Sequence, residues 1–321
     1  MVKPVIYITR KLPDNLIKPF QETYDIRMWD EASTPVPTET LREEVKHADA
    51  LFCLITEKID REFLREHSHL KVIANMAVGY DNIDVEAAKE YGVTITNTPD
   101  VLTETTADLT FTLLLSTARR IVEAANTIYQ NNWGDWAPFS LAGSDVHGKT
   151  LGIVGMGRIG AAVARRAKGF NMNVIYHNRS RKKEVEEELD LSYVTQEELL
   201  ETADFVVSLV PLTDETKEMF NRTAFAKMKT SAIFINASRG GVVDETALYN
   251  ALKDGEITAA GLDVFQEEPI SSVHPFASLS NAVLLPHIGS ATVQTREAMA
   301  KLCLENIEAV TTGKKAKTPI T

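Results

Sequence analysis

Short β-rich runs alternate with helical patterns along almost the whole chain, and this alternation restricts the possible fold more than any other feature. Two series of runs follow one another, separated by stretches with helical spacing of apolar residues. Strand, helix, strand repeats of this length build parallel sheets with helices on both faces. The runs are Val5–Thr9, Ile26–Trp29, Ala50–Ile55, Lys71–Ala74 and Val93–Thr96 in the first series, and Thr150–Val154, Asn173–Tyr176, Phe205–Val210, Ala232–Asn236, Ala259–Val264 and Val283–Leu285 in the second.

The chain has 321 residues, more than one hydrophobic core usually serves, so we expect two domains. A helix over Thr103–Gln130 and a loop over Asn131–Gly143 connect the two series. The helical pattern Val293–Thr311 has no sheet of its own and is expected to return to the first domain. The predicted fold is α/β: a flavodoxin-like domain of residues 1–100 and 291–321, a Rossmann domain of residues 101–290, and a cleft between them.

The composition excludes several classes of partner. A net charge of -11 argues against nucleic acid and anionic membranes as partners of the whole chain. The longest apolar stretch, Leu109–Ala118, is too short to span a bilayer, and the N-terminal run is too short for a signal peptide. Cys53 and Cys303 lie in apolar segments and are expected to be buried free thiols. We therefore expect a cytoplasmic protein with no metal site, and we interpret the acidic run Glu184–Asp190 as a solvated helix face.

A glycine-rich loop opens the second domain. Gly155, Gly157 and Gly160 form a G-x-G-x-x-G pattern that follows an apolar strand and precedes a strong helix former. In this context the glycines let the backbone approach a pyrophosphate held at the helix N-terminus. The alternative is a tight turn without a ligand.

The end of the next strand indicates which dinucleotide is bound. An NAD-binding domain places a carboxylate there, against the ribose 2′-hydroxyl. This chain instead has Asn178, Arg179 and Ser180, and its first carboxylate is Glu184. A guanidinium and a hydroxyl suit a 2′-phosphate, so we predict a preference for NADP(H), with NAD(H) still possible. A solvated basic turn is the alternative.

Three side chains of the second domain could carry out hydride-transfer chemistry. Arg239, Glu268 and His287 each follow one of three consecutive strands, which places them on one edge of the sheet. Taken singly, each could be an ordinary loop or structural residue. Together they offer a cation for a substrate carboxylate and a proton donor for the developing alkoxide. A carboxylate beside His287 would fix its tautomer and favour the protonated ring.

These features resemble the D-isomer-specific 2-hydroxyacid dehydrogenase family over nearly the full length of the chain. Within that family the corner at Asn178, Arg179 and Ser180 is most similar to the glyoxylate and hydroxypyruvate reductases, which also lack the acid. Met76 and Gln266 differ from the residues most relatives have. The matching stretches are Ala77–Asp84, Thr106–Asp108, Gly155–Gly160, Asn236–Gly241, Gly261–Phe265 and Pro286–Ser290.

The resemblance implies a role for each matching residue. Arg239 would bind the substrate carboxylate and carbonyl, while Glu268 orients His287 and His287 exchanges the proton. The backbone amides of Val78 and Gly79 would hold the carboxylate. Asp263 would lie near the nicotinamide amide. The implied cofactor contacts are Thr106, Gly155, Gly157, Arg158, Ile159, Gly160, Asn178, Arg179, Ser180, Pro211, Ala237, Ser238, Arg239, Asp263, His287 and Gly289.

The expected activity is NADPH-dependent reduction of glyoxylate or hydroxypyruvate to glycolate or D-glycerate, by a homodimer built on the second domain. A 2-ketogluconate reductase or another D-2-hydroxyacid dehydrogenase is the alternative. Phosphoglycerate dehydrogenase is less favoured, because the cofactor corner is not acidic and no regulatory domain follows before Thr321. A nucleotide-sensing corepressor is the competing class, which the complete catalytic set argues against. The apolar helix from Thr103 and the loop with Trp133 and Trp136 suggest the dimer.

Overall fold

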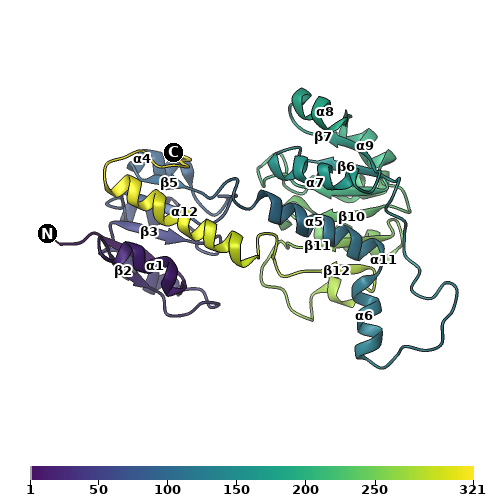
Figure 1. Cartoon of the computed structure of the whole chain (residues 1–321), viewed down its shortest axis with the longest axis horizontal. Coiled ribbons are helices and arrows are strands. Elements are labelled where there is room, and N and C mark those ends of the chain that lie inside the picture. Colours follow the sequence, from purple (N-terminus) through teal and green to yellow (C-terminus); the bar gives the residue numbers. More distant parts are fainter. Residues whose placement is uncertain (1) are drawn as a thin grey trace. The chain divides into compact units, whose positions relative to one another are not determined.

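The computed structural model describes residues 2–321, which form two compact units that we treat one at a time. Unit 1 comprises the residues up to Leu102 together with Thr292–Thr321, and unit 2 comprises Thr103–Ala291. Each unit contains one parallel sheet with helices packed on its faces (Figure 1). This confirms the predicted α/β class with two parallel sheets.

Unit 1 is a five-stranded sheet in the order β2-β1-β3-β4-β5. This is the flavodoxin-like order, in which the chain reverses direction beside β1. The strands are β1 (Val5–Ile8), β2 (Asp25–Met28), β3 (Ala50–Cys53), β4 (Val72–Asn75) and β5 (Thr94–Thr96), and the helices are α1 (Asp14–Gln21), α2 (Thr38–Val45), α3 (Arg61–Glu66), α4 (Val85–Tyr91) and α12 (Val293–Thr311).

Helix α12 brings the end of the chain back to unit 1, where it packs against β3, β4 and β5 (Figure 1). Its buried residues include Met299, Cys303, Leu304 and Ile307. A second core forms where sheet side chains such as Leu51 meet residues of α2, α3 and α4. Both faces of the sheet are therefore covered, which explains why the central strands are apolar at almost every position.

Unit 2 is a seven-stranded parallel sheet in the order β12-β11-β10-β9-β6-β7-β8. The sequence pattern indicated six of these strands and missed β8, which is only two residues long. The strands are β6 (Thr150–Val154), β7 (Asn173–His177), β8 (Ser192–Tyr193), β9 (Phe205–Ser208), β10 (Ile233–Asn236), β11 (Ala259–Leu262) and β12 (Ala282–Leu284); the helices are α5 (Thr103–Ala118), α6 (Ile121–Tyr129), α7 (Arg158–Lys168), α8 (Lys183–Leu189), α9 (Gln196–Thr202), α10 (Arg222–Lys227) and α11 (Glu245–Lys253), with short 3-10 turns η1 (Gly240–Val242) and η2 (Pro275–Ser278).

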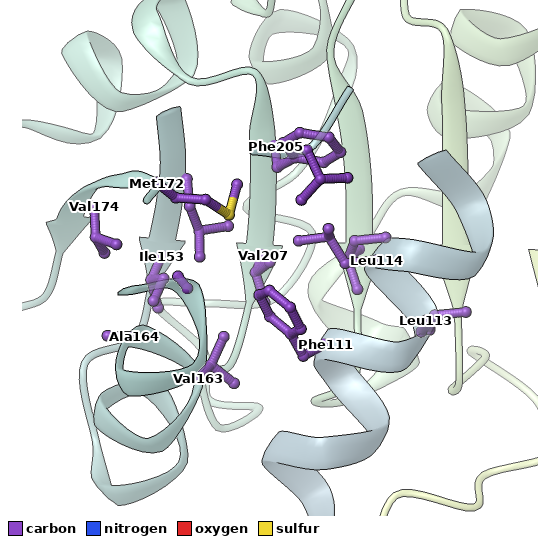
Figure 2. Close-up of a cluster of buried hydrophobic side chains, with 14 of the residues drawn as sticks. Phe111, Leu113, Leu114, Ile153, Val163, Ala164, Met172, Val174, Phe205 and Val207 are labelled. Atoms are coloured by element: carbon purple, nitrogen blue, oxygen red, sulfur yellow. The ribbon is translucent and has the colours of Figure 1, made fainter. Parts of the chain in front are cut away.

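Alternate side chains of the central strands feed two separate cores, one on each face of the sheet. Phe205 and Val207 of β9 pack with Phe111 of α5 and Val163 of α7 (Figure 2). Val206, between them, lies in the other core with residues of α9, α10 and α11. This alternation follows from the two-residue repeat of a strand. Packing on both faces of the sheet holds the carboxyl ends of the strands in a fixed row.

The helix expected over Thr103–Gln130 is two helices, α5 and α6. The chain breaks at Arg120, whose φ of 53° lies in the left-handed region, so it cannot continue an α-helix. The Arg120 guanidinium then pairs with Glu123 in the first turn of α6. No glycine or proline marks this break, which explains why the periodicity did not reveal it.

The prediction that the acidic run is a solvated face is wrong for Glu186. This residue of α8 is buried, and its carboxylate accepts hydrogen bonds from the Tyr176 hydroxyl and the Arg181 guanidinium. The bonds from Arg181 and then Tyr176 hold the pKa of Glu186 below its usual range. The run therefore contains one residue that organises the neighbouring loop.

Both cysteines are free and buried, as predicted. Burial raises the pKa of both thiols, which makes Cys53 and Cys303 poor nucleophiles. Over residues 2–321, no helix combines the length and the apolar character needed to cross a bilayer.

Candidate active site

Arg239, Glu268 and His287 all lie beyond the carboxyl ends of neighbouring strands of unit 2. Arg239 follows β10, Glu268 follows β11 and His287 follows β12. Because β10, β11 and β12 are adjacent and parallel, the three loops leave the same edge of the sheet. This is the edge at which parallel α/β sheets bind ligands.

His287 and Glu268 form a direct pair. The distance from His287 Nδ1 to Glu268 Oε2 is 2.8 Å, and Glu268 Oε1 accepts the Phe265 amide at 2.9 Å. Burial alone would raise the pKa of Glu268. The hydrogen bond and charge of His287, with the Phe265 amide and the Arg239 charge, outweigh burial and hold that pKa below its usual range. An ionised carboxylate can only accept, so Nδ1 carries a hydrogen and Nε2 is left to act on a substrate.

Asp263 shapes the turn that carries His287. Its carboxylate accepts the amides of Ile288 and Gly289, both at 2.8 Å, and its carbonyl accepts the His287 amide at 2.9 Å. These bonds hold His287 at a φ of 53°, in the left-handed region that few non-glycine residues occupy. Burial raises the pKa of Asp263, although the two amides and the charge of His287 act in the opposite direction. The sequence pattern gave no indication of this supporting role.

The Arg239 loop is held by its own neighbours. Asn236 donates from Nδ2 to the Arg239 carbonyl at 2.9 Å, and Arg239 donates from Nη1 to the Ser238 carbonyl at 2.9 Å. A Cβ on Gly240 would lie 1.8 Å from the carbonyl carbon of Phe265. Only glycine therefore lets this loop pack against the loop that carries Glu268, and the charge of Arg239 contributes to the lowered pKa of Glu268.

The three glycines of the loop after β6 have three different tasks. Gly155 adopts a φ of 104°, and a Cβ there would lie 2.6 Å from the carbonyl carbon of Leu209. A Cβ on Gly160 would lie 2.4 Å from the Gly155 carbonyl oxygen, so it allows the helix to approach the turn. Gly157 is the N-cap of α7, and a Cβ there would meet no protein atom within 4 Å. The loop thus fits a pyrophosphate above the helix N-terminus.

The corner after β7 is held by contacts that the sequence did not reveal. Asn178 donates from Nδ2 to the Ser180 carbonyl at 2.9 Å, which fixes the turn that contains Arg179. The Lys182 amide donates to the Tyr176 hydroxyl, which itself donates to the buried Glu186. Arg179 is left with an 89% exposed side chain, 3.7 Å from Glu215. An anion could therefore reach its guanidinium.

The remaining cofactor candidates lie in unit 2, whereas Val78 and Gly79, the candidates for the substrate carboxylate, lie in unit 1. A Cβ on Gly289 would lie 3.3 Å from Asp263 Oδ2 and 3.4 Å from Thr106 Cγ2, so these three residues form a cluster. Ser238 and Ser208 are linked by their hydroxyls at 3.1 Å. Arg158 and Ile159 open α7, Pro211 follows β9, Ala237 follows β10, and Val78 and Gly79 of unit 1 follow β4.

The family model of the NAD-binding domain of D-isomer specific 2-hydroxyacid dehydrogenases matches residues 111–289. These residues lie within unit 2 and include all three side chains described above.

Similarity to individual proteins extends over the whole chain. A glyoxylate reductase of Thermococcus litoralis is 50% identical over 316 residues, covering 97% of this chain and 95% of that protein. A solved structure from Thermus thermophilus has a TM-score of 0.92 and 43% identity, covering 99% and 100% of the two chains. The NADPH-dependent glyoxylate/hydroxypyruvate reductase of Sinorhizobium meliloti, solved with NADP and malonate, has a TM-score of 0.85 and 32% identity, with 99% and 97% coverage.

Proposed function

The chain belongs to the D-isomer-specific 2-hydroxyacid dehydrogenase family, and from this premise we propose that it reduces glyoxylate or hydroxypyruvate to glycolate or D-glycerate with NADPH. As a member of that family it is an NAD(P)-dependent oxidoreductase acting on small 2-keto and 2-hydroxy acids. The observation that carries the proposal is the His287–Glu268 pair at 2.8 Å, on the same sheet edge as Arg239. Unit 2 would bind the dinucleotide, and unit 1 would contribute to substrate binding.

In the proposed mechanism His287 supplies the proton. A bound nicotinamide dinucleotide supplies the hydride to C2 of the keto acid. Negative charge then develops on the C2 oxygen, and His287 Nε2 donates a proton to it, giving the 2-hydroxy acid. Glu268 stabilises the protonated imidazole through Nδ1 and keeps Nε2 directed toward the substrate. Solvent reprotonates His287 for the next turnover.

The substrate carboxylate needs a cation and hydrogen-bond donors. We assign Arg239 to the carboxylate and the C2 carbonyl, because a guanidinium can donate two parallel hydrogen bonds. We assign the backbone amides of Val78 and Gly79 to the same carboxylate. Asp263 and the amides it holds would stand beside the nicotinamide.

NADPH is the proposed reductant because the corner after β7 holds Arg179 and Ser180 where a carboxylate would select NADH. The similar Sinorhizobium meliloti reductase, whose crystal structure contains NADP, supports this choice. The Arg181–Glu186 pair and the Asn178 turn support the corner in unit 2.

Changing Asn178 to Asp and Arg179 to Ala together should move the preference from NADPH toward NADH. A charge-assisted hydrogen bond contributes about 1.5–3 kcal/mol, so losing one should raise the KM for NADPH by about tenfold to a hundredfold. Steady-state kinetics with both cofactors would measure the change. Lys183→Ala is the matched control, because it removes a nearby positive charge outside the corner. Equal use of NADH and NADPH by the unmodified enzyme would contradict this interpretation.

A substrate-by-cofactor kinetic matrix tests the proposed function as a whole. Glyoxylate, hydroxypyruvate, 2-ketogluconate and pyruvate would each be assayed with NADPH and NADH. We expect the highest kcat/KM for glyoxylate or hydroxypyruvate with NADPH. A preference for 2-ketogluconate would support the alternative reductase within the family. Tight dinucleotide binding without turnover of any keto acid would instead support a nucleotide-sensing binding module.

We also propose that the enzyme is a homodimer built on unit 2. Helix α6 exposes Ile121, Ile128 and Tyr129, and the following loop has Trp133 and Trp136 at 76% and 85% exposure. Monomeric proteins seldom expose so many large apolar side chains along one segment. A second copy of the chain would cover them.

Light scattering at micromolar concentration should therefore give twice the chain mass of 35.6 kDa. Ile128→Arg places a charge in the proposed interface and should shift the mass toward that of one chain. Val293→Arg, at an exposed apolar residue of unit 1, should leave the mass unchanged. A single-chain mass for the wild-type protein would refute the dimer.

The two buried free thiols suit a reducing compartment, where structural disulfides are rare. We therefore place the enzyme in the cytoplasm.

A further inference from the structure

The segment that follows β4 in unit 1 has three successive peptide carbonyls, each held by a different donor. The Ala77 carbonyl accepts the Thr98 amide at 2.8 Å. The Val78 carbonyl accepts Asn97 Nδ2 at 2.8 Å, and the Gly79 carbonyl accepts Asn75 Nδ2 at 3.0 Å. Side chains of two asparagines thus fix the orientation of two neighbouring peptide units.

Holding the carbonyls determines where the amides point. In a planar trans peptide the C=O and the N–H of the same unit point in opposite directions. The amides of Val78, Gly79 and Tyr80 are therefore directed away from Thr98, Asn97 and Asn75. Within residues 2–321, none of these three amides donates to another group, and Val78 and Tyr80 are exposed. Consecutive backbone amides without a protein acceptor can donate together to one anion.

Asn97 is itself held in place by the last residues of the chain. The Thr318 hydroxyl donates to the Asn97 carbonyl at 2.6 Å, and Thr96 forms an antiparallel bridge with Pro319. The buried Asn306 of α12 accepts the Thr318 amide at 3.1 Å and donates from Nδ2 to the Thr318 hydroxyl at 2.8 Å. The backbone of Asn97, whose side chain orients the Gly79 amide, is thus fixed by α12 and the segment after it.

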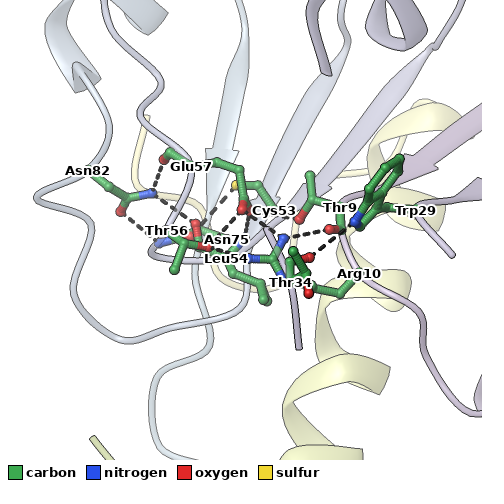
Figure 3. Close-up of polar contacts among 10 residues, drawn as sticks. All are labelled: Thr9, Arg10, Trp29, Thr34, Cys53, Leu54, Thr56, Glu57, Asn75 and Asn82. Carbon is green, nitrogen blue, oxygen red and sulfur yellow. Dashed lines mark hydrogen bonds and ion pairs between the residues drawn. The ribbon is translucent and has the colours of Figure 1, made fainter. Parts of the chain in front are cut away.

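Asn75, at the start of the segment Asn75–Asn82, belongs to a polar network that also contains Asn82, Glu57 and Arg10 (Figure 3). Asn82 donates to the carbonyls of Leu54 and Glu57, at 3.1 Å and 2.9 Å. Glu57 pairs with Arg10 at 3.1 Å, with side chains that are only 3% and 6% exposed. Hydrogen bonds of Asn75 and Asn82 therefore fix both the start and the end of the segment Asn75–Asn82.

We propose that Asn97 and Asn75 are positioning residues, which turn the amides of Gly79 and Tyr80 outward and so set the geometry of the carboxylate site. The inference rests on the proposed function, in which these amides bind the carboxylate of a keto acid. It adds the Tyr80 amide as a third donor and assigns the orientation of the site to two side chains that do not touch the substrate. Removing either side chain would leave a peptide unit free to rotate.

Asn97→Ala is the sharper test, because Asn97 is only half-buried while Asn75 is fully buried. Loss of a well-oriented donor to a carboxylate should raise the KM for glyoxylate by about tenfold. The kcat and the KM for NADPH should stay within about threefold, because the proton donor and the dinucleotide loop lie in unit 2. Asn97→Asp keeps the shape but has no hydrogen to donate, so it should raise the KM for glyoxylate at least as much.

Asn281→Ala is the matched control. Like Asn97, Asn281 donates from Nδ2 to the backbone, here to two carbonyls, but it precedes β12, at the amino end of the strand. It should lower the melting temperature about as much as Asn97→Ala without raising the KM for glyoxylate. A general loss of stability would therefore not imitate the expected result.

A binding measurement that needs no turnover completes the test. Oxamate, a non-reducible analogue of glyoxylate, should shift the amide resonances of Gly79 and Tyr80 in the wild-type protein, and Asn97→Ala should require about tenfold more oxamate. Equal titrations in both proteins, or a KM changed by less than twofold, would overturn the inference while leaving the proposed function intact. If the wild type does not reduce glyoxylate, the proposed function fails. The oxamate titration alone then tests the inference about Asn97. A Gly79 shift weakened by Asn97→Ala then supports the inference, and no shift overturns it.

Discussion

Replacing His287 with alanine is expected to lower kcat for glyoxylate reduction by about 10²–10⁴, the usual contribution of a general acid. The alkoxide that develops at C2 would then have only water as a proton source. NADPH affinity should change little, because the dinucleotide loop of Gly155–Gly160 is unaffected. Steady-state kinetics and a fluorescence titration with NADPH would measure the two quantities. His147→Ala is a matched control, since His147 is exposed and precedes the amino end of β6. A near-normal kcat for His287→Ala would mean that another group donates the proton.

Glu268→Gln tests the same pair through its pH dependence. The pKa of Glu268 is held low, by His287 above all, so this carboxylate stays ionised across neutral pH. Its charge and its hydrogen bond to Nδ1 stabilise the imidazole that donates the proton in reduction. Glutamine keeps the shape but not the charge. Without that charge, the profile of kcat against pH should move to lower pH. An unchanged pH profile would show that the charge of Glu268 does not act on His287.

Replacing Arg239 with alanine should lower kcat/KM for glyoxylate by about 10²–10⁴, because two charge-assisted hydrogen bonds to the substrate are lost together. Unlike His287→Ala, this change should raise KM as well as lower kcat, since the carboxylate is bound before and during hydride transfer. Arg239→Lys keeps the charge but not the two-pronged geometry, so it should give an intermediate result.

Arg222→Ala serves as the matched control for Arg239. Arg222 is exposed at the start of α10, outside the loops that carry the three candidate side chains. It should leave both kinetic constants unchanged. If Arg239→Ala lowered kcat without any change in KM for glyoxylate, the carboxylate would have another partner.

The parallel sheets could be predicted because their strands are apolar on both faces and separated by amphipathic helices. The same pattern located the helix over Val293–Thr311, which the structure has with the same bounds. It could not locate β8, because two residues are too few to show a period. It also missed the break at Arg120, because that break depends on a left-handed backbone conformation for which arginine has no preference. Local propensity is weak evidence wherever a single backbone angle decides the outcome.

The candidate site was predicted in a similar way. Placing Arg239, Glu268 and His287 on one edge needed only the order of the strands, and the structure gives the His287–Glu268 distance of 2.8 Å. The supporting contacts were not predictable, because they depend on how the loops fold rather than on the order of the strands. Asp263 holds the turn after His287, and Glu186 holds the corner after β7. Each is an acidic residue that sequence alone treats as an ordinary surface charge or a ligand contact.

The left-handed backbone of His287 has a consequence for laboratory evolution. Most residues that carry a Cβ destabilise the fold by about 1–3 kcal/mol in that region. Glycine and, to a lesser degree, asparagine adopt it at lower cost. Glycine or asparagine at residue 287 would remove much of this cost and also remove the proton donor. A mutant library screened only for survival after heating should thus enrich inactive clones at this codon. Screening the same library for turnover should retain histidine, so heat resistance and catalysis select in opposite directions at one residue.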